Sequence, residues 1–90
     1  MLNVKQQIAE VLAPSVGVLS APEIEALIEI PTDTSMGDYA FPCFKLAKQL
    51  RKAPAMIAAD IAAAVSGNEL FEKVEQVNAY VNMFMKKGSE

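Results

Sequence analysis

The segment from Val74 to Met85 most constrains the fold, because its side chains alternate with the two-residue period of a β-strand. One side is almost entirely apolar and comprises Val77, Ala79, Val81, Met83 and Met85. The other side mixes amides with aromatic rings and comprises Gln76, Asn78, Tyr80, Asn82 and Phe84. A turn near Asn78-Ala79 would divide the segment into a hairpin, yet Tyr80, Asn82 and Phe84 would still share a face. A strand with one apolar and one polar side is typical of an antiparallel sheet.

Two stretches have helical periodicity. Asn3 is predicted to cap a first helix running to about Ala13, with Gln6 completing a weak capping box. Pro14 is expected to end that helix, because proline disfavours helical backbone in the residue before it. Pro54 is expected to begin a second helix that continues to Val65, with its apolar residues spaced four apart.

The remaining elements are predicted to be shorter. Pro22 can start a helical turn through Glu25, and Ala26 to Ile30 is expected to form a strand that Pro31 closes. Asn68 is expected to cap a short turn, ELFEK, that directs Leu70 and Phe71 into the core. The chain is therefore predicted to form one α+β domain over residues 1–90: a small antiparallel β-sheet of about three strands with three to four helices packed on one face.

A basic segment follows the polar loop at Gly37-Asp38. With Pro42 in its first turn, a helix over Phe44 to Lys52 would separate cations from apolar side chains. Its positive side holds Lys45, Lys48 and Lys52, with Arg51 at the margin. Its apolar side holds Cys43, Leu46, Ala47 and Leu50. This helix is either an ordinary solvated amphipathic helix or a small positive docking surface.

Composition excludes several kinds of function. The chain has no histidine, which removes Ser-His and Cys-His nucleophile pairs and most transition-metal sites. The sequence contains neither of the glycine-rich phosphate-binding motifs, G-x-x-x-x-G-K-[ST] and G-x-G-x-x-G. A small free-standing enzyme is therefore not supported. The single cysteine permits no internal disulfide, which suits the cytoplasm. The net charge of −3 is uneven: residues 41–62 carry +3, so a small contact with RNA is compatible with an acidic chain.

Four motifs in order carry a resemblance to a known family. They are IEIPTDTSMGDYA, the helix motif LAK, the MIAADIA helix after Pro54, and the late YVNMF. This order resembles the N-terminal appended domain of arginyl-tRNA synthetases, over Ile28 to Met85. The histidine-containing ATP-binding signature of such class I enzymes is impossible here. The resemblance therefore implies a non-catalytic piece of arginine–tRNA ligase, whose ATP and arginine bind a catalytic domain absent from this chain.

The resemblance also implies partners and site residues. The appended domain contacts the D-loop at the outer corner of tRNA, so the expected partners are tRNA(Arg) and the catalytic domain of the same synthetase, with no membrane and no DNA. Carried over by position, the base-contacting residues are Tyr80 and Asn82, with Asn78 as a third candidate. Phosphates would contact the basic segment through Lys45, Lys48, Arg51 and Lys52. No cofactor or metal is expected in this domain.

One alternative stays open from the residues alone. The amide and aromatic side of Val74 to Met85 also suits an ordinary half-buried strand with its polar side in water. The basic helix could equally dock an acidic partner protein or another domain, which would make the chain a protein-interaction module.

Overall fold

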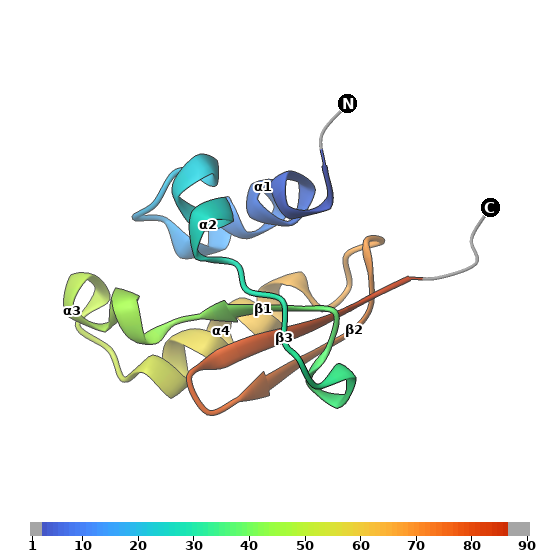
Figure 1. Cartoon of the computed structure of the whole chain (residues 1–90). Helices are drawn as coiled ribbons and strands as arrows, with labels where there is room; N and C mark the ends of the chain where they lie inside the picture. Colours follow the sequence, from blue (N-terminus) through green and yellow to red (C-terminus); the bar gives the residue numbers. More distant parts are fainter. Residues whose placement is uncertain (1–2, 87–90) are drawn as a thin grey trace.

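A three-stranded antiparallel sheet forms the centre of the molecule. The computed structural model describes residues 3–86, apart from the side chain of Thr34. The strands are β1 (Tyr39–Pro42), β2 (Phe71–Val77) and β3 (Tyr80–Met85), in the order β1-β3-β2 (Figure 1). The central strand is thus the one that carries the alternating amides and rings.

Helices cover the inner face of this sheet. The helix α4 (Pro54–Val65) packs on β2 and β3, and α1 (Val4–Val16) packs on both α4 and α2 (Ala21–Leu27). Figure 1 shows α4 behind the sheet and the α1–α2 pair at its upper edge. One apolar cluster joins these helices to the inner side chains of the sheet, which include Phe41, Val81 and Met83. The α+β class and the three antiparallel strands are therefore confirmed.

The first helix is longer than expected. Asn3 and Gln6 form the predicted capping box, with Asn3 Oδ1 accepting from the Gln6 N–H at 2.8 Å. The helix nevertheless continues past Pro14 to Val16 and ends at Gly17, which is left-handed with φ of 80°. Burial of Val16 one turn after Leu12 extends the apolar stripe, so tertiary packing overrides the proline signal.

The predicted strand at Ala26 to Ile30 is wrong. The turn that begins at Pro22 grows into the helix α2, which ends only at Leu27. Beyond it, Glu29 forms an isolated antiparallel bridge with Ala40. The apolar Ile30, at the end of the predicted strand, is 64% exposed. Short apolar runs do not distinguish a helix end from a strand, which explains the error.

The prediction of a single basic helix from Phe44 to Lys52 is also wrong in detail. Residues Tyr39–Pro42 are strand β1 rather than a loop and a helix start. They are followed by a 3₁₀ turn, η2 (Phe44–Leu46), and one α-turn, α3 (Ala47–Leu50). Arg51 then adopts a left-handed backbone with φ of 54°, which ends the helix. The predicted amphipathic division holds, because Leu46 is buried and the four cations are exposed.

The segment Val74 to Met85 forms a hairpin. Val77 pairs with Tyr80, so the loop has two residues, Asn78 and Ala79. Asn78 has a positive φ of 53°, a conformation that asparagine adopts more readily than most residues. The predicted ELFEK turn is shorter than expected, because Phe71 already begins β2. Asn68 Oδ1 accepts from the Leu70 N–H at 2.9 Å just before it.

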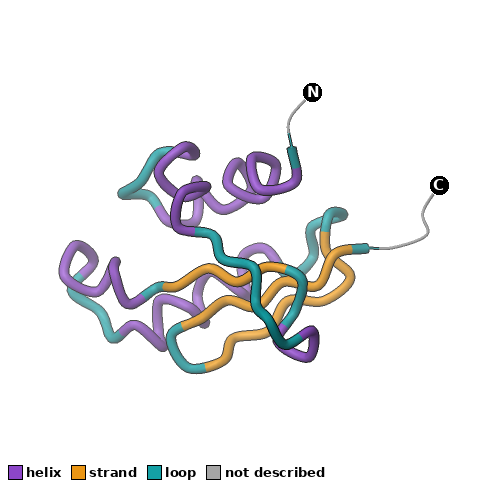
Figure 2. Tube along the Cα trace, in the orientation of Figure 1, coloured by secondary structure: helices purple, strands orange, loops and turns teal. Residues whose placement is uncertain are grey.

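A segment that we call the strap, residues 30–37, crosses the outer face of the sheet (Figure 2). Before it, Glu29 and Ala40 exchange two backbone hydrogen bonds of 2.8 Å. After it, the Asp38 N–H donates to the Met83 carbonyl at 2.9 Å. Both ends of the strap are therefore tied to the sheet by backbone hydrogen bonds. Over the described residues, no helix is long and apolar enough to cross a membrane.

Candidate nucleic-acid interface

The side chain of Asn82 lies on the outer face of the sheet but is only 1% exposed. It stands at the centre of β3, paired with Ala40 on one side and Glu75 on the other. Within the part of the chain that the structure describes, its Nδ2 atom has no hydrogen-bond partner. Buried donors without partners are rare and costly, so this one marks the outer face of β3 as a candidate binding site.

A small pocket, which Asn82 helps to line, lies on this face of the sheet. It has a volume of about 200 Å³, and the strap forms one wall of it. Its lining residues come from the strap and its entry, from β1 and from β3: Glu29, Pro31, Thr32, Asp33, Met36, Ala40, Tyr80 and Asn82. The alternative in which the polar side of this strand lies in water does not hold for Asn82, because the strap covers this residue from the outside.

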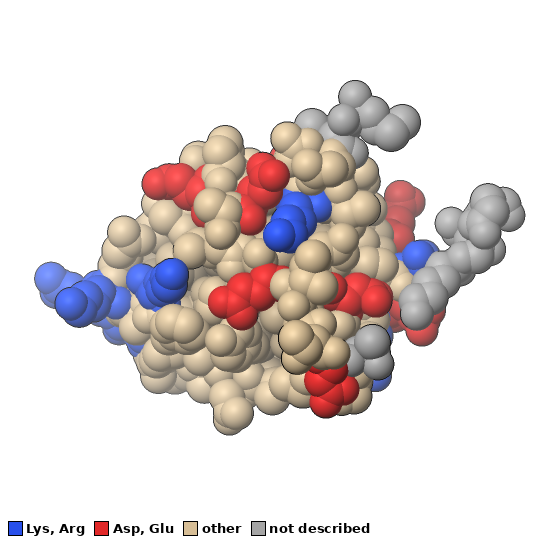
Figure 3. Space-filling model, in the orientation of Figure 1, with Lys and Arg blue, Asp and Glu red and all other residues tan. Residues whose placement is uncertain are grey.

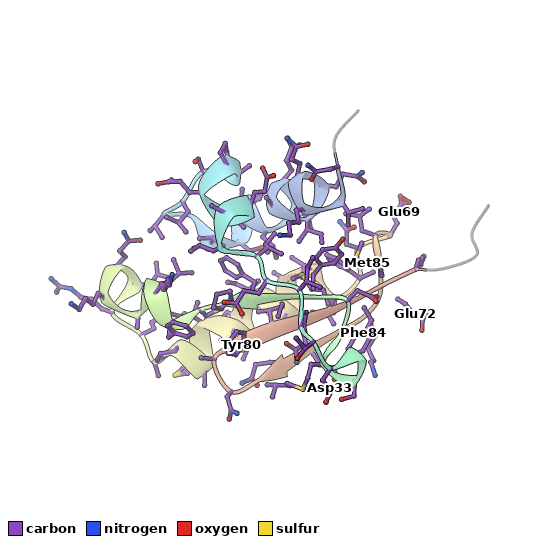
Figure 4. All side chains as sticks on the ribbon, viewed as in Figure 1. Asp33, Glu69, Glu72, Tyr80, Phe84 and Met85 are labelled. Atoms are coloured by element: carbon purple, nitrogen blue, oxygen red, sulfur yellow. The ribbon has the colours of Figure 1, made fainter. Side chains whose placement is uncertain are left out.

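Tyr80 forms the side of the pocket nearest the basic segment. Its ring is half-buried and meets the Phe44 ring edge-on, with centroids 5.9 Å apart and planes at 74°. Figure 4 shows Tyr80 at the end of the sheet toward α3, with Asp33 further along the outer face. Phe44 thus links the first residue of β3 to the beginning of the cationic segment.

The rim of the pocket is acidic. Glu29 and Asp33 both line it and are exposed. The backbone N–H and the hydroxyl of Ser35 donate to Asp33 Oδ1 at 2.9 and 2.8 Å, and these hydrogen bonds lower the pKa of the Asp33 carboxyl. A phosphate would be repelled here, whereas a neutral group that presents both acceptors and donors would fit.

The cationic segment comprises Lys45, Lys48, Arg51 and Lys52, all exposed. Figure 3 shows blue side chains gathered at the left edge, where α3 lies, while acidic groups occupy the middle of the same face. Lys52 forms an ion pair with Asp60 of α4, so part of its charge is already neutralised. The other three have no ion pair among the described residues, which leaves their charge available to an anionic partner.

The structure brings together some of the predicted site residues and separates others. Tyr80 and Asn82 line one pocket, and Phe44 connects them to the cationic segment. Asn78 lies apart, exposed at the hairpin turn, where its carbonyl accepts from Gln76 Nε2 at 2.6 Å.

Sequence reasoning missed three residues of the site: Glu29, Asp33 and Phe44. Glu29 and Asp33 enter the pocket through the path of the strap, for which no local signal exists. Phe44 was detectable, as an aromatic residue directly before the cations.

Among the described residues, neither a metal site nor a reactive thiol accompanies this pocket. Over residues 3–86, no cluster of histidine, cysteine, aspartate or glutamate could hold a metal ion. Cys43 is fully buried behind β1, and burial raises the pKa of its thiol to about 12. Cys43 is therefore a core residue whose thiol stays protonated, and the reactive form of cysteine is the thiolate.

The fold and the site define a class of protein: a small α+β domain that carries a polar pocket beside a cationic edge. The family model for the arginyl-tRNA synthetase N-terminal domain matches residues 2–85. The chain therefore belongs to the family of arginyl-tRNA synthetase N-terminal domains.

Curated relatives agree with this family. The chain is 49% identical over 87 residues to an arginine–tRNA ligase of Clostridioides difficile, and 44% identical over 87 residues to that of Halothermothrix orenii. Each match covers 97% of this chain but 15% of the relative, so the chain spans about a seventh of the length of these enzymes. Among solved structures, Thermus thermophilus arginyl-tRNA synthetase superposes with a TM-score of 0.73 at 24% identity, over 93% of this chain and 14% of that one. This likeness shows a shared fold.

Proposed function

We propose that this chain is the tRNA-binding accessory domain of a cytoplasmic arginine–tRNA ligase. In this proposal it contacts the D-loop at the elbow of tRNA(Arg) and so supports ATP-dependent aminoacylation by the rest of the enzyme. The observation that carries the proposal is the buried Asn82 amide, whose Nδ2 has no partner among the described residues, at a pocket that Asn82 lines together with Tyr80.

The pocket's chemistry favours an unpaired nucleobase. Asn82 Nδ2 can donate to a ring nitrogen or carbonyl oxygen on the edge of a base, and the carboxylates of Glu29 and Asp33 can accept from amino or imino groups. The Tyr80 ring offers a stacking partner, as in proteins that recognise single-stranded RNA loops. A base reaches such a pocket only when it is unstacked, which suits a loop and not a helix of RNA.

The adjoining cations supply the sequence-independent part of the contact. Lys45, Lys48 and Arg51 would neutralise phosphates near the base that enters the pocket, which positions the RNA without specifying its sequence. The acidic rim keeps phosphates out of the pocket itself. In this arrangement the pocket holds the base, and the cationic segment holds the phosphates of the RNA backbone.

Chemical-shift mapping with an unmodified tRNA(Arg) transcript tests this proposal. At low salt, we expect perturbations of the Asn82 side-chain amide, Tyr80 and the Lys45–Arg51 segment, and no change in α1. A transcript with a substituted D-loop base should lose the Asn82 perturbation and keep that of the cationic segment. If tRNA shifts no resonance while an acidic protein domain shifts the cationic segment, the chain is a protein-interaction module instead.

A further inference from the structure

Phe44 is the most exposed aromatic side chain among the described residues. It is 46% exposed, whereas Phe41 and Phe71 are buried and the other rings are half-buried. Its exposure follows from the local backbone: η2 turns Cys43 and Leu46 into the core, so Phe44 and Lys45 point outward. Nearly half of this aromatic residue is thus exposed to water beside a group of cations, where a partner can reach it.

The contact between Phe44 and Tyr80 leaves ring surface available. The two planes cross at 74°, so the rings do not cover each other by stacking face to face. Their centroids lie 5.9 Å apart. A base stacked on each ring would lie parallel to that ring, so two bases held on these crossed planes would be unstacked from one another.

We propose that Phe44 is a second stacking platform, which binds the unpaired nucleotide adjacent to the one whose base enters the Asn82 pocket. This inference rests on the proposed function and extends it from one base to two. Lys45 follows Phe44 directly and Lys48 lies one helical turn further, so the phosphate joining two such nucleotides would have cations beside it. Stacking accepts any base, so Phe44 contributes affinity while Asn82 supplies discrimination.

A purely structural role for Phe44 makes different predictions. If its ring only supports Tyr80, a leucine of similar bulk keeps that apolar contact and keeps the affinity for RNA. If the ring stacks on a base, leucine and alanine both remove the stack. We therefore expect Phe44→Leu and Phe44→Ala to weaken tRNA binding about tenfold each, and Phe44→Trp to bind within about twofold of wild type. Circular dichroism and thermal unfolding establish that each variant is folded.

The chain has no tryptophan, so Phe44→Trp creates a unique fluorescent reporter at the site. Stacking on a base quenches indole fluorescence. We expect strong quenching when the tRNA(Arg) transcript is added, and we expect one abasic substitution in the D-loop to abolish it. That position should neighbour the one whose loss removes the Asn82 perturbation. Val18→Trp, at a residue 41% exposed in the connector between α1 and α2, is the matched control and should not be quenched.

The outcomes separate the two proposals. Binding seen at Asn82 without quenching at position 44, or wild-type affinity in Phe44→Leu, overturns the role of Phe44 and leaves the proposed function intact. An absence of any tRNA-dependent shift in the wild-type chain overturns the proposed function, and the role of Phe44 with it.

Discussion

The carboxylate of Asp38 accepts a hydrogen bond from the backbone N–H of Met85, 47 residues later, at 2.8 Å. The backbone N–H of Asp38 donates to the Met83 carbonyl of the same strand. Asp38 therefore pairs with β3 through its backbone and its side chain, and prolongs the contact between β1 and β3 by one residue.

We expect Asp38→Ala to destabilise the domain by about 1–3 kcal/mol, because it leaves the half-buried Met85 N–H without its acceptor. Asp38→Asn is the matched control, since its side-chain oxygen can accept the same hydrogen bond. Urea unfolding of the three proteins measures the difference. Equal stability of the alanine variant and wild type would show that the hydrogen bond from the Met85 N–H to the Asp38 carboxylate does not stabilise the domain.

Gly37 allows the strap to approach β3 closely. Its φ is 104°, and a Cβ added there would lie 3.0 Å from the Met83 carbonyl oxygen. We expect Gly37→Ala to cost about 1–3 kcal/mol of unfolding free energy, from the disfavoured backbone and the clash. Gly67→Ala is the control, because a Cβ at Gly67 meets nothing within 4 Å. If Gly37→Ala left the unfolding free energy unchanged, the strap would not be held against β3.

Burial of Cys43 predicts a specific pH dependence of stability. Because the pKa of the thiol rises to about 12 in the folded chain, the unfolded chain releases this proton at lower pH than the folded one. Stability from this group is therefore complete below the unfolded pKa near 8.5. It then falls by about 1.4 kcal/mol per pH unit as the pH rises toward 12. Denaturation of wild type and Cys43→Ala between pH 8 and 10.5 isolates this contribution, since every other titrating group is common to both.

Removing a cation should weaken tRNA binding more when that cation forms no ion pair within the chain. We expect Lys48→Gln to raise the Kd for tRNA(Arg) and to lower the slope of log K against log salt by about one. Lys52→Gln should have a smaller effect, because Lys52 is already paired with Asp60. Lys5→Gln in α1 is the control and should leave the slope unchanged. Equal effects at all three positions would indicate a diffuse electrostatic contact without a defined edge.

Asn82→Ala should separate recognition from stability. The variant deletes a buried donor that has no partner, which offsets part of the cost of the small cavity, so we expect stability to change by no more than about 1–2 kcal/mol. Discrimination between tRNA(Arg) and transcripts with a substituted D-loop base should fall by about 1–3 kcal/mol. In the full-length enzyme, ATP–pyrophosphate exchange should be unchanged while aminoacylation weakens.

Asn3→Ala, which removes an amide from the N-cap of α1, is the comparison for Asn82→Ala. It should cost about 1 kcal/mol of stability with no change in base discrimination. If Asn82→Ala alters only stability, or reduces ATP–pyrophosphate exchange as much as aminoacylation, Asn82 does not read a base.

The sequence by itself determined those features that repeat with a local period. The alternation through Tyr80, Asn82 and Phe84 predicted that they share a sheet face, and the residue pairing confirms it. The four-residue spacing that ends at Val65 predicted α4, and the wheel around Leu46 predicted which side of the basic segment is buried. These features follow from the neighbours of each residue along the chain, which is why they were predictable.

Only the tertiary structure decided what covers the outer face of the sheet. The strap reaches Asn82 because Glu29 bonds Ala40 and Asp38 bonds Met83 and Met85, contacts between residues 11 to 47 positions apart. The same contacts turned Tyr39–Pro42 into a strand and left Ile30 exposed. Backbone pairing between distant segments depends on the tertiary fold of the whole chain, so local sequence patterns do not predict it. The burial of the Asn82 amide, on which the proposed function rests, follows from that closure alone.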